Sequence, residues 1–322
     1  MRPRINRWTS SRRELIFGNS IKSSLVQPHF VVPGEKIDNR ISGMPGINRQ
    51  SVDVLIKTIE EDMRIGIKAH MLFLVMDDSH RDDNASFASN PKSPLHKAVK
   101  ILKNKFGDEI VIMTDVCLCT GTEHGHCGII VDNNIENDQS VNELVKIAVS
   151  HAEVGVDYVA ASDMMDGRVK KIRNKFEDLG YFSTGILSYS VKYASSFYGP
   201  FREAAESSPK FGDRRSHQMD FRSGYSEAIM EAKLDQEEGA DILMVKPGLP
   251  YLDVLRKISE EVVRPLAVYN VSGEYAMIMN SSSNSSERGK MVIEILHSFK
   301  RAGADVIVTY HAREALREEW IV

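Results

Sequence analysis

The stretch Gly239-Ala240-Asp241-Ile242-Leu243-Met244-Val245-Lys246 contains the pattern on which the fold prediction rests. A glycine follows a helical stretch, a short apolar run comes next, and a lysine stands directly after the run. Glycine often ends a helix because it adopts the left-handed backbone conformation without a steric penalty. The same Gly-x-Asp opening precedes two other apolar runs, at 155–157 and 303–305. Each opening is therefore interpreted as the junction between a helix and the next strand of a β/α unit.

Apolar runs of strand length recur along the whole chain, and longer stretches of helical character separate them. The runs lie at 30–32, 71–75, 110–113, 158–161, 185–189, 242–245, 266–269 and 306–309. They are continuous rather than alternating, which is typical of parallel strands buried on both faces. Of the stretches between them, 51–65 and 140–154 carry apolar residues at helical spacing,.

Eight β/α units predict an α/β protein with a (β/α)8 TIM barrel. A doubly wound open sheet is the alternative, but no Gly-x-Gly-x-x-Gly fingerprint follows a strand,. We expect the catalytic barrel to occupy 29–322. Residues 1–28 precede it and are interpreted either as an N-terminal arm that contacts a partner subunit or as a frayed terminus.

Two segments of the predicted barrel are expected to be loops. The segment 193–224 is long and rich in Ser, Arg, Phe and Gly, and long loops in compact domains often act as lids,. The serine-rich segment 280–286 is expected to form an exposed turn.

The composition excludes several classes of protein. Hydrophobic residues make up 42% of the 322 positions, charged residues 27%, and the net charge is -4. This balance is ordinary for a soluble globular protein and lacks the basic excess of a nucleic-acid-binding domain. No apolar run approaches the roughly 20 residues of a membrane span, and no apolar region follows the basic N-terminus as in a secretory signal. We therefore expect no nucleic-acid partner and no membrane association.

All three cysteines lie close together, as Cys117, Cys119 and Cys127. An odd, clustered set argues against a disulfide framework and for a reducing compartment, most simply the cytoplasm. Thiolates suit zinc better than magnesium or manganese, and three protein ligands leave a fourth position open, as in catalytic zinc sites. His124 and His126 are expected to be structural or to support the ligands. The alternative is that the cysteines are small buried hydrophobes.

Polar side chains gather where the predicted strands end, which is where barrel enzymes hold their catalytic groups. These residues are Asp77, Asp78, Asp115, Cys117, Ser162, Asp163, Lys192, Lys246, Ser272, Glu274 and Tyr310. Desolvation and a second ammonium nearby lower the pKa of a lysine and leave a nucleophilic amine that attacks ketones to form a Schiff base. A single lysine could instead reach solvent or pair with an acid. Two lysines at corresponding strand ends, Lys192 and Lys246, favour catalysis.

The predicted lid is basic. It contains Arg202, Lys210, Arg214 and Arg215, with Gln218 close behind. Because arginine binds carboxylates in a bidentate fork, these side chains over a Schiff-base site suggest a substrate with carboxylates. The alternative is a solvated basic loop.

Several long motifs resemble the porphobilinogen synthase (5-aminolevulinate dehydratase) family, from about Gln27 to Tyr310. They are the cysteine stretch, Ser-Asp-Met-Met-Asp-Gly-Arg at 162–168, Ser-Val-Lys-Tyr-Ala-Ser at 190–195, Met-Val-Lys-Pro-Gly-Leu-Pro-Tyr at 244–251 and Val-Ser-Gly-Glu-Tyr-Ala-Met at 271–277. The resemblance implies a (β/α)8 barrel with an N-terminal arm, typically a homo-octamer. It also implies a hydro-lyase that condenses two 5-aminolevulinate molecules into porphobilinogen, in tetrapyrrole (haem) biosynthesis.

The resemblance further implies a role for individual residues. Lys246 would form the Schiff base with the first substrate, and Lys192 would bind the second. The carboxylate of the second substrate would be held by Arg202, Arg214 and Gln218, and that of the first by Ser272 and Tyr310. Asp115 and Ser162 would line the pocket, and Cys117, Cys119 and Cys127 would bind the catalytic zinc. Glu231 matches a position where some members bind an allosteric magnesium.

The chain departs from the family pattern at two places. Thr120-Gly121 replaces an acidic residue and a tyrosine after the second cysteine, which we expect to loosen the loop and alter the packing of the metal site. The segment 280–286 is also unusual. Some members replace the cysteines and work without zinc, whereas this chain keeps all three. The rival functions are a class I aldolase, which needs no metal, and a non-enzymatic metal-binding protein.

Overall fold

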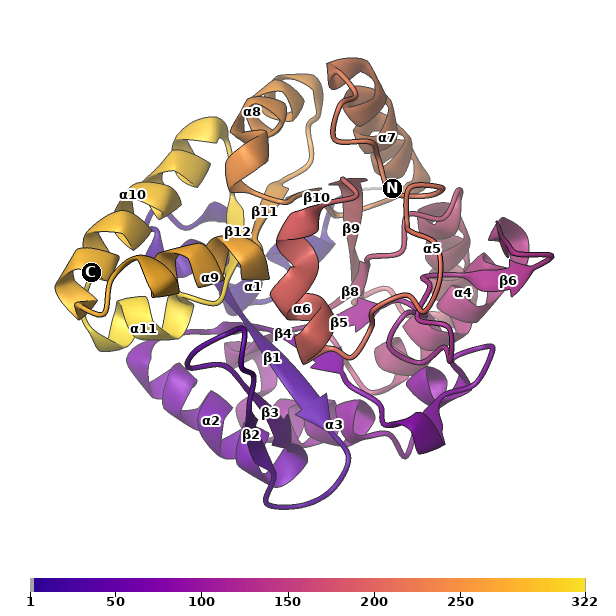
Figure 1. Cartoon of the computed structure of the whole chain (residues 1–322), viewed down its shortest axis with the longest axis horizontal. Helices are drawn as coiled ribbons and strands as arrows, with labels where there is room; N and C mark the ends of the chain where they lie inside the picture. The colour runs from indigo at the N-terminus through magenta and orange to yellow at the C-terminus, as the bar shows by residue number, and fades with distance from the viewer. Residues whose placement is uncertain (1–2, 322) are drawn as a thin grey trace.

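The computed structural model describes residues 3–321, and its centre is a closed barrel of parallel strands (Figure 1). In barrel order the strands are β1 (Leu25–Val32), β4 (Ala69–Leu74), β5 (Val111–Val116), β8 (Tyr158–Ala161), β9 (Gly185–Lys192), β10 (Ile242–Lys246), β11 (Leu266–Asn270) and β12 (Val306–Thr309). Pairing of Leu25 with Ile307 joins β1 to β12 and closes the ring. The predicted (β/α)8 barrel is confirmed, and the doubly wound alternative is wrong.

A helix follows each barrel strand and packs on the outside of the ring. These helices are α2 (Val52–Ile65), α3 (Pro94–Phe106), α4 (Asn137–Glu153), α5 (Arg168–Leu179), α7 (Tyr225–Glu238), α8 (Leu252–Glu261), α10 (Ser285–Ala302) and α11 (Ala312–Arg317). Gly239 and Gly303 end α7 and α10 in the left-handed conformation, as the Gly-x-Asp pattern predicts. Gly155 has the same conformation, two residues past the end of α4.

The first strand is longer than its apolar run. It begins at Leu25, before the predicted start of the barrel at position 29, and includes the buried polar residues Gln27 and His29. These polar side chains hide the strand in the sequence.

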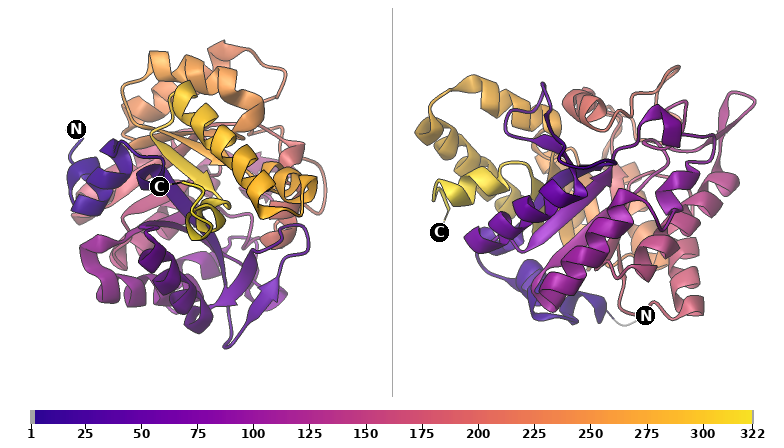
Figure 2. Two further views of the ribbon diagram at one scale, coloured as in Figure 1. Left: turned by 90° about the vertical axis from the view of Figure 1, so that its left-hand side faces the viewer. Right: turned by 90° about the horizontal axis from the view of Figure 1, so that it is seen from below.

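The residues before β1 form three short helical elements, η1 (Ile5–Arg7), α1 (Ser10–Phe17) and η2 (Lys22–Ser24). They cover the N-terminal face of their own barrel, opposite the lid (Figure 2). The Arg12 guanidinium forms a buried ion pair with Asp157, with Nη2 2.7 Å from Oδ1. The amide of Asn6 donates to the main-chain carbonyl of Asp241 at 2.9 Å. A frayed terminus is therefore wrong for 5–24, positions 1–2 lie outside the described residues, and contact with a partner subunit stays a prediction.

Several elements of the structure have no counterpart in the sequence prediction. Two antiparallel hairpins, β2 (Asp38–Arg40) with β3 (Asn48–Ser51) and β6 (Ile129–Val131) with β7 (Asn134–Glu136), extend from the loops. Single 3-10 turns are η3 (Asp78–His80), η4 (Ser86–Ser89), η5 (Gly107–Glu109) and η7 (Leu249–Tyr251). The expected turn at 280–286 is largely helical, since α9 (Ser272–Ser281) ends within it and α10 begins at Ser285.

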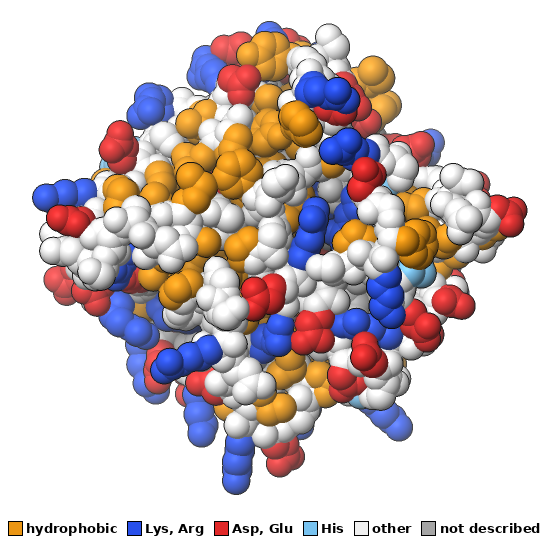
Figure 3. All heavy atoms as spheres, in the orientation of Figure 1, with side chains coloured by type: hydrophobic (Ala, Val, Ile, Leu, Met, Phe, Trp, Pro, Cys, Tyr) orange, Lys and Arg blue, Asp and Glu red, His pale blue; other side chains and the backbone are white. Residues whose placement is uncertain are grey.

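The segment 193–224 covers the C-terminal mouth of the barrel and contains η6 (Ser196–Tyr198) and α6 (Gly199–Ala204). In Figure 1, α6 crosses the mouth. Seen from this side, basic side chains lie near the centre of the surface, with acidic ones beside them (Figure 3). Within residues 3–321, no helix has both the length and the apolarity to cross a membrane.

The core is divided between two apolar layers. One lies between the strands and the outer helices, and the other fills the barrel. The inner layer becomes aromatic toward the mouth, where the rings of Phe30 and Phe73 lie 5.7 Å apart and those of Tyr269 and Tyr310 lie 6.0 Å apart. Packed aromatic rings therefore line the bottom of the mouth.

Candidate active site

Lys192 and Lys246 end two adjacent strands and are register partners in the β9–β10 pairing. Both are buried, with 5% and 6% of their surface exposed. Their Nζ atoms lie 5.7 and 5.0 Å from the centre of the same ring, that of Tyr189. The structure thus brings together the two lysines that follow apolar runs in the sequence.

Lys246 lies in an aromatic box that sequence reasoning did not identify. Its Nζ is 4.3 Å from the ring centre of Tyr269, 5.1 Å from that of Tyr198 and 5.2 Å from that of Phe201. Burial, and then the positive charge of Lys192, lower the pKa of Lys246 to about 7. A large fraction of this amine is therefore uncharged and nucleophilic near neutral pH.

The amine of Lys192 donates a hydrogen bond to the main-chain carbonyl of Ser162. Ser162 follows β8, so this bond joins the β9 lysine to the neighbouring strand end. Asp115, near the end of β5, is also buried in the mouth. Burial raises its pKa to about 6, against the charges of the two lysines, and its Oδ1 has no hydrogen-bond partner within residues 3–321. Asp115 is thus available to exchange a proton with a bound molecule.

The three cysteine thiols form a buried cluster in which all Sγ atoms lie within 4.8 Å of one another. The Sγ atoms of Cys117 and Cys119 are 3.2 Å apart. Hydrogen bonds from these two thiols hold the pKa of Cys127 well below its ordinary value. Three converging sulfur donors, at least one favoured as thiolate, suit a soft metal such as zinc.

The two histidines of the cysteine stretch hold the loop rather than extend the sulfur cluster. His126 Nε2 is hydrogen-bonded to the carbonyl of Phe211 in the lid at 2.9 Å. The main-chain N–H of His126 donates to His124 Nδ1 at 3.1 Å. Both side chains therefore have the structural role that we expected.

Gly121 does not loosen this loop, contrary to the expectation from the sequence. A Cβ atom at this position would lie 2.7 Å from Ala85 Cβ and 3.0 Å from Met76 Cε. Its amide donates to Leu118 at 2.9 Å, and its carbonyl accepts from Asp82 at 3.1 Å. The glycine permits a close approach of two loops, because a side chain at this position would collide with Ala85.

The lid contributes an unsatisfied set of polar groups. Gln218 is buried, and neither atom of its amide has a hydrogen-bond partner within the described chain. The same holds for Nε of Arg202 and of Arg214. Burial and the charge of Arg214 lower the pKa of Arg202. An anion between the two guanidinium groups would offset the repulsion between them and raise this pKa again.

Two other basic residues of the lid do not join this set. Lys210 and Arg215 are exposed, and Arg215 pairs with Asp213, with Nε 3.6 Å from Oδ2. Nothing in the residue types or their spacing distinguishes them from Arg202 and Arg214.

Ser272 and Tyr310 lie on the Lys246 side of the mouth. The Ser272 hydroxyl accepts a hydrogen bond from the main-chain N–H of Phe201 at 2.9 Å, which connects α9 to the lid. The Tyr310 and Tyr269 hydroxyls are 2.9 Å apart, and the Tyr269 ring is the one closest to Lys246 Nζ. Tyr310 thus contacts the ring nearest the Lys246 amine, and Ser272 is bonded to the main chain of Phe201, whose ring also lies near that amine.

Glu231 lies away from the lysines, on α7. It borders a cavity of about 450 Å³ together with Glu227, Asp166 and Asp220. Burial raises the pKa of Glu231. The predicted magnesium residue thus borders a cavity that contains several carboxylates and is lined in part by the lid.

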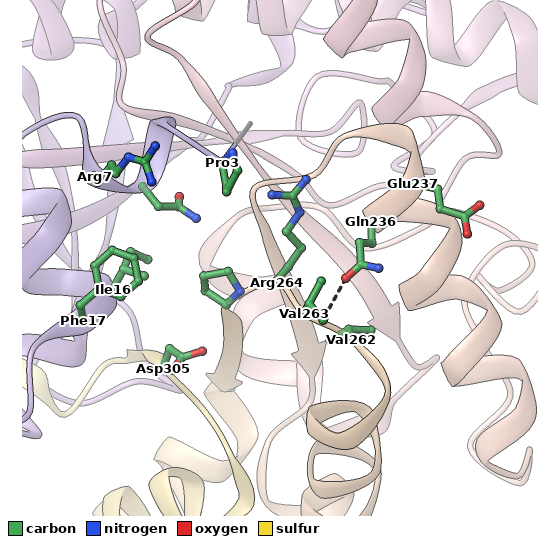
Figure 4. Close-up of a pocket in the computed structure, with 12 residues that line it drawn as sticks. Pro3, Arg7, Ile16, Phe17, Gln236, Glu237, Val262, Val263, Arg264 and Asp305 are labelled. Atoms are coloured by element: carbon green, nitrogen blue, oxygen red, sulfur yellow. Dashed lines mark hydrogen bonds between the residues drawn. The ribbon is translucent and has the colours of Figure 1, made fainter. Parts of the chain in front are cut away.

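A larger cavity, of about 690 Å³, lies at the opposite end of the barrel (Figure 4). Ile16, Phe17, Val262 and Val263 supply its apolar wall, and Arg264 also borders it. None of the predicted site residues lines it, so cavity size does not mark the active site in this protein.

Comparison with known proteins identifies the family of the chain. The family model described as delta-aminolevulinic acid dehydratase matches residues 1–318. The chain is 49% identical over 297 residues to the delta-aminolevulinic acid dehydratase of Methanothermus sociabilis, covering 92% of this chain and 91% of the relative. It is 42% identical over 313 residues to that of Bacillus subtilis, covering 97% and 95%.

A solved structure shows the same fold. The delta-aminolevulinic acid dehydratase (porphobilinogen synthase) of Toxoplasma gondii ME49, in complex with the reaction product porphobilinogen, superposes with a TM-score of 0.89 at 44% identity. The match covers 99% of this chain and 91% of that one. The chain belongs to the delta-aminolevulinic acid dehydratase family.

Proposed function

We propose that the chain condenses two molecules of 5-aminolevulinate into porphobilinogen and two molecules of water, with Lys246 and Lys192 each holding one substrate. The observation that carries this assignment is the pair of buried lysines over Tyr189, one of which has its pKa lowered to about 7. Two ketone substrates suit two amines at one mouth. Holding both substrates there turns a bimolecular condensation into an effectively unimolecular step.

Lys246 is proposed to form the Schiff base with the first substrate. Its neutral amine attacks the keto carbon, the carbon–oxygen bond breaks, and the oxygen leaves as water once it is protonated. Asp115, with its pKa raised to about 6, is able to supply or remove protons at this stage,. Ser272 and Tyr310 are the proposed partners of the carboxylate of this substrate.

Lys192 is proposed to hold the second substrate. Its contact with the Ser162 carbonyl fixes the direction of the amine. Arg202, Arg214 and Gln218 are proposed to bind the carboxylate of this substrate, because their polar atoms are buried without enough protein partners. The positive charges of Arg202 and Arg214 in the lid would then be paired with the substrate carboxylate.

Cys117, Cys119 and Cys127 are the proposed ligands of a catalytic zinc. When bound, zinc supplies a Lewis acid that polarises a carbonyl or lowers the pKa of a bound water. The nearby Arg214 donates to the carbonyl of Gly125 at 2.9 Å and so supports the loop that carries Cys127.

Three further assignments follow from the family resemblance. Glu231 is proposed as a ligand of an allosteric magnesium, supported by the acidic cavity that it shares with Glu227 and Asp166. The chain is proposed to form a homo-octamer through the N-terminal segment that precedes β1, of which the structure describes 3–24. It is proposed to act in the cytoplasm, which suits its three free thiols,.

The test is to incubate the protein with 5-aminolevulinate, reduce with borohydride and map the adduct. The adduct is expected on Lys246, and labelling of other residues with Lys246 free would overturn the assignment. A colour assay for porphobilinogen separates this function from those of a class I aldolase or a metal-binding protein, neither of which forms this product.

A further inference from the structure

Glu274, in the first turn of α9, carries a fully buried carboxylate with four hydrogen-bond donors. Its Oε1 accepts from the main-chain N–H groups of Gly248 and Leu249, both at 3.0 Å. Its Oε2 accepts from Asn270 Nδ2 at 2.6 Å and from the N–H of Val271 at 3.2 Å. Within residues 3–321 no basic side chain forms an ion pair with it.

Burial of this carboxylate makes the free energy of folding less favourable. Burial raises the pKa of Glu274 to about 7, against the effect of the four donors. Stability alone is better served by a neutral residue at such a position, since an unpaired buried charge opposes folding. The bond to Val271 makes Glu274 a cap of α9, but a cap requires only that one bond,. The two bonds to Gly248 and Leu249 reach a different strand end.

The hydrogen bonds continue from Glu274 across two further strand ends. Asn270, the last residue of β11, accepts at Oδ1 from the Thr309 hydroxyl at 2.9 Å. Thr309 ends β12 and accepts at the same hydroxyl from the N–H of His311 at 3.2 Å. The series of hydrogen bonds Gly248–Glu274–Asn270–Thr309 therefore joins the ends of β10, β11 and β12.

The residues next to this series of hydrogen bonds are those proposed to bind the first substrate. Lys246 precedes Gly248 by two positions, Ser272 precedes Glu274 by two, and Tyr310 follows Thr309. On its other side the Lys246 carbonyl accepts from the N–H of Tyr193 at 3.0 Å. The Lys246 main chain is thus held from the lid side and from the Glu274 side.

We infer that Glu274 is a positioning residue that fixes the main chain after Lys246 relative to Ser272 and Tyr310, so that the amine meets the keto carbon of the first substrate. This inference rests on the proposed function of Lys246. Glu274 does not touch the reacting atoms. It acts through the N–H groups of Gly248 and Leu249.

The test compares Glu274→Gln with the exchange variant Asn270→Asp/Glu274→Gln. In the single variant the oxygen of the new amide at 274 can still accept from Gly248 and Leu249. Its NH2 group then points at the NH2 group of Asn270, so two donors face each other. In the exchange variant the new carboxylate at 270 accepts from the new amide at 274 and still accepts from Thr309. The exchange preserves the total charge and restores the chain of bonds.

The readouts are the first-order rate of borohydride-trapped adduct at Lys246 with saturating 5-aminolevulinate, and the melting temperature. We expect Glu274→Gln to slow trapping by about 10- to 100-fold and the exchange variant to recover most of that rate. Asp305→Asn is the matched control, because Asp305 accepts from the N–H of Leu266 at the opposite end of the same strands, at 2.8 Å. It should lower the melting temperature without slowing trapping.

The inference is overturned if Glu274→Gln lowers the melting temperature like the control but traps at the wild-type rate. It is also overturned if the exchange variant folds and traps no faster than the single variant. Should the single variant fail to fold, Thr309→Val removes the last donor of the chain and is expected to slow trapping several-fold. An unchanged rate there decides against the inference. Wild-type protein that forms no adduct at Lys246 refutes the proposed function instead.

Discussion

Lys192 and Lys246 are paired across adjacent parallel strands, and both amines lie over the Tyr189 ring. Parallel pairing places the two residues at the same height in the barrel, and both amines lie within 5.7 Å of the centre of one ring. The effect of each charge on the other therefore follows from strand register rather than from a flexible loop. This register makes the pH dependence of Lys246 a direct test of the site.

The rate of Schiff-base formation at Lys246 should rise as the pH increases through about 7 and then level off. The reason is that burial and Lys192 lower the pKa of Lys246 to about 7, so that the neutral amine is the main form above this pH. Lys192→Met removes a repelling charge and should move the midpoint to higher pH. Borohydride trapping at a series of pH values measures it, with the exposed lid variant Lys210→Met as the control. A midpoint that Lys192→Met leaves unchanged would contradict the coupling.

Removal of metal with a chelator should abolish porphobilinogen formation, and added zinc should restore it. Cys127→Ser should bind less zinc than the wild type, because one of three converging sulfur donors is lost. His124→Gln is the matched control from the same loop and should keep the wild-type zinc content. Elemental analysis of the dialysed proteins gives the comparison. Full activity of metal-free protein would refute the zinc assignment.

Gly121→Ala should destabilise the protein by about 1–3 kcal/mol, the usual cost of overpacking. The new methyl group would meet Ala85 Cβ at 2.7 Å. Gly224→Ala is the control, because a Cβ at that position meets no atom within 4 Å. Urea unfolding of both variants measures the difference. Equal stability of the two variants would show that the loops of Gly121 and Ala85 can move apart at little cost in free energy.

Arg12→Met should lower the free energy of unfolding by about 1.5–3 kcal/mol, the usual contribution of a hydrogen bond to a charged group. The variant leaves Asp157 buried with Lys103 as its remaining ion-pair partner, at 3.1 Å. Arg13→Met, at an exposed position of the same helix, should change stability little. Denaturant unfolding followed by circular dichroism checks both. If Arg12→Met lowers the free energy of unfolding only slightly, the ion pair with Asp157 does not hold the N-terminal segment to its barrel.

The barrel could be predicted from the sequence because its strands are short continuous apolar runs separated by helical stretches. Prediction failed where polar residues are buried. Gln27 and His29 lie inside β1, so the strand looked shorter than it is. The two hairpins were missed because three- and four-residue strands carry no detectable period.

The site was predictable where one residue carries the chemistry, and not where several strands contribute together. A lysine after an apolar run is visible in the sequence, as are clustered cysteines. The aromatic box around Lys246 combines Tyr189, Tyr198, Phe201 and Tyr269, which lie in separate parts of the chain. Gly121 shows the same limit, since its neighbour Ala85 belongs to another loop.

The lid is attached to the loop that carries Cys127. The N–H of Lys210 donates to the carbonyl of His124 at 3.0 Å, and the Arg214 guanidinium donates to the carbonyl of Gly125 at 2.9 Å. The lid therefore cannot swing away from the mouth as a free flap without breaking bonds to the sulfur-bearing loop. A molecule that displaces the lid should therefore also shift the loop that carries Cys127, and with it the spacing of the three sulfur atoms.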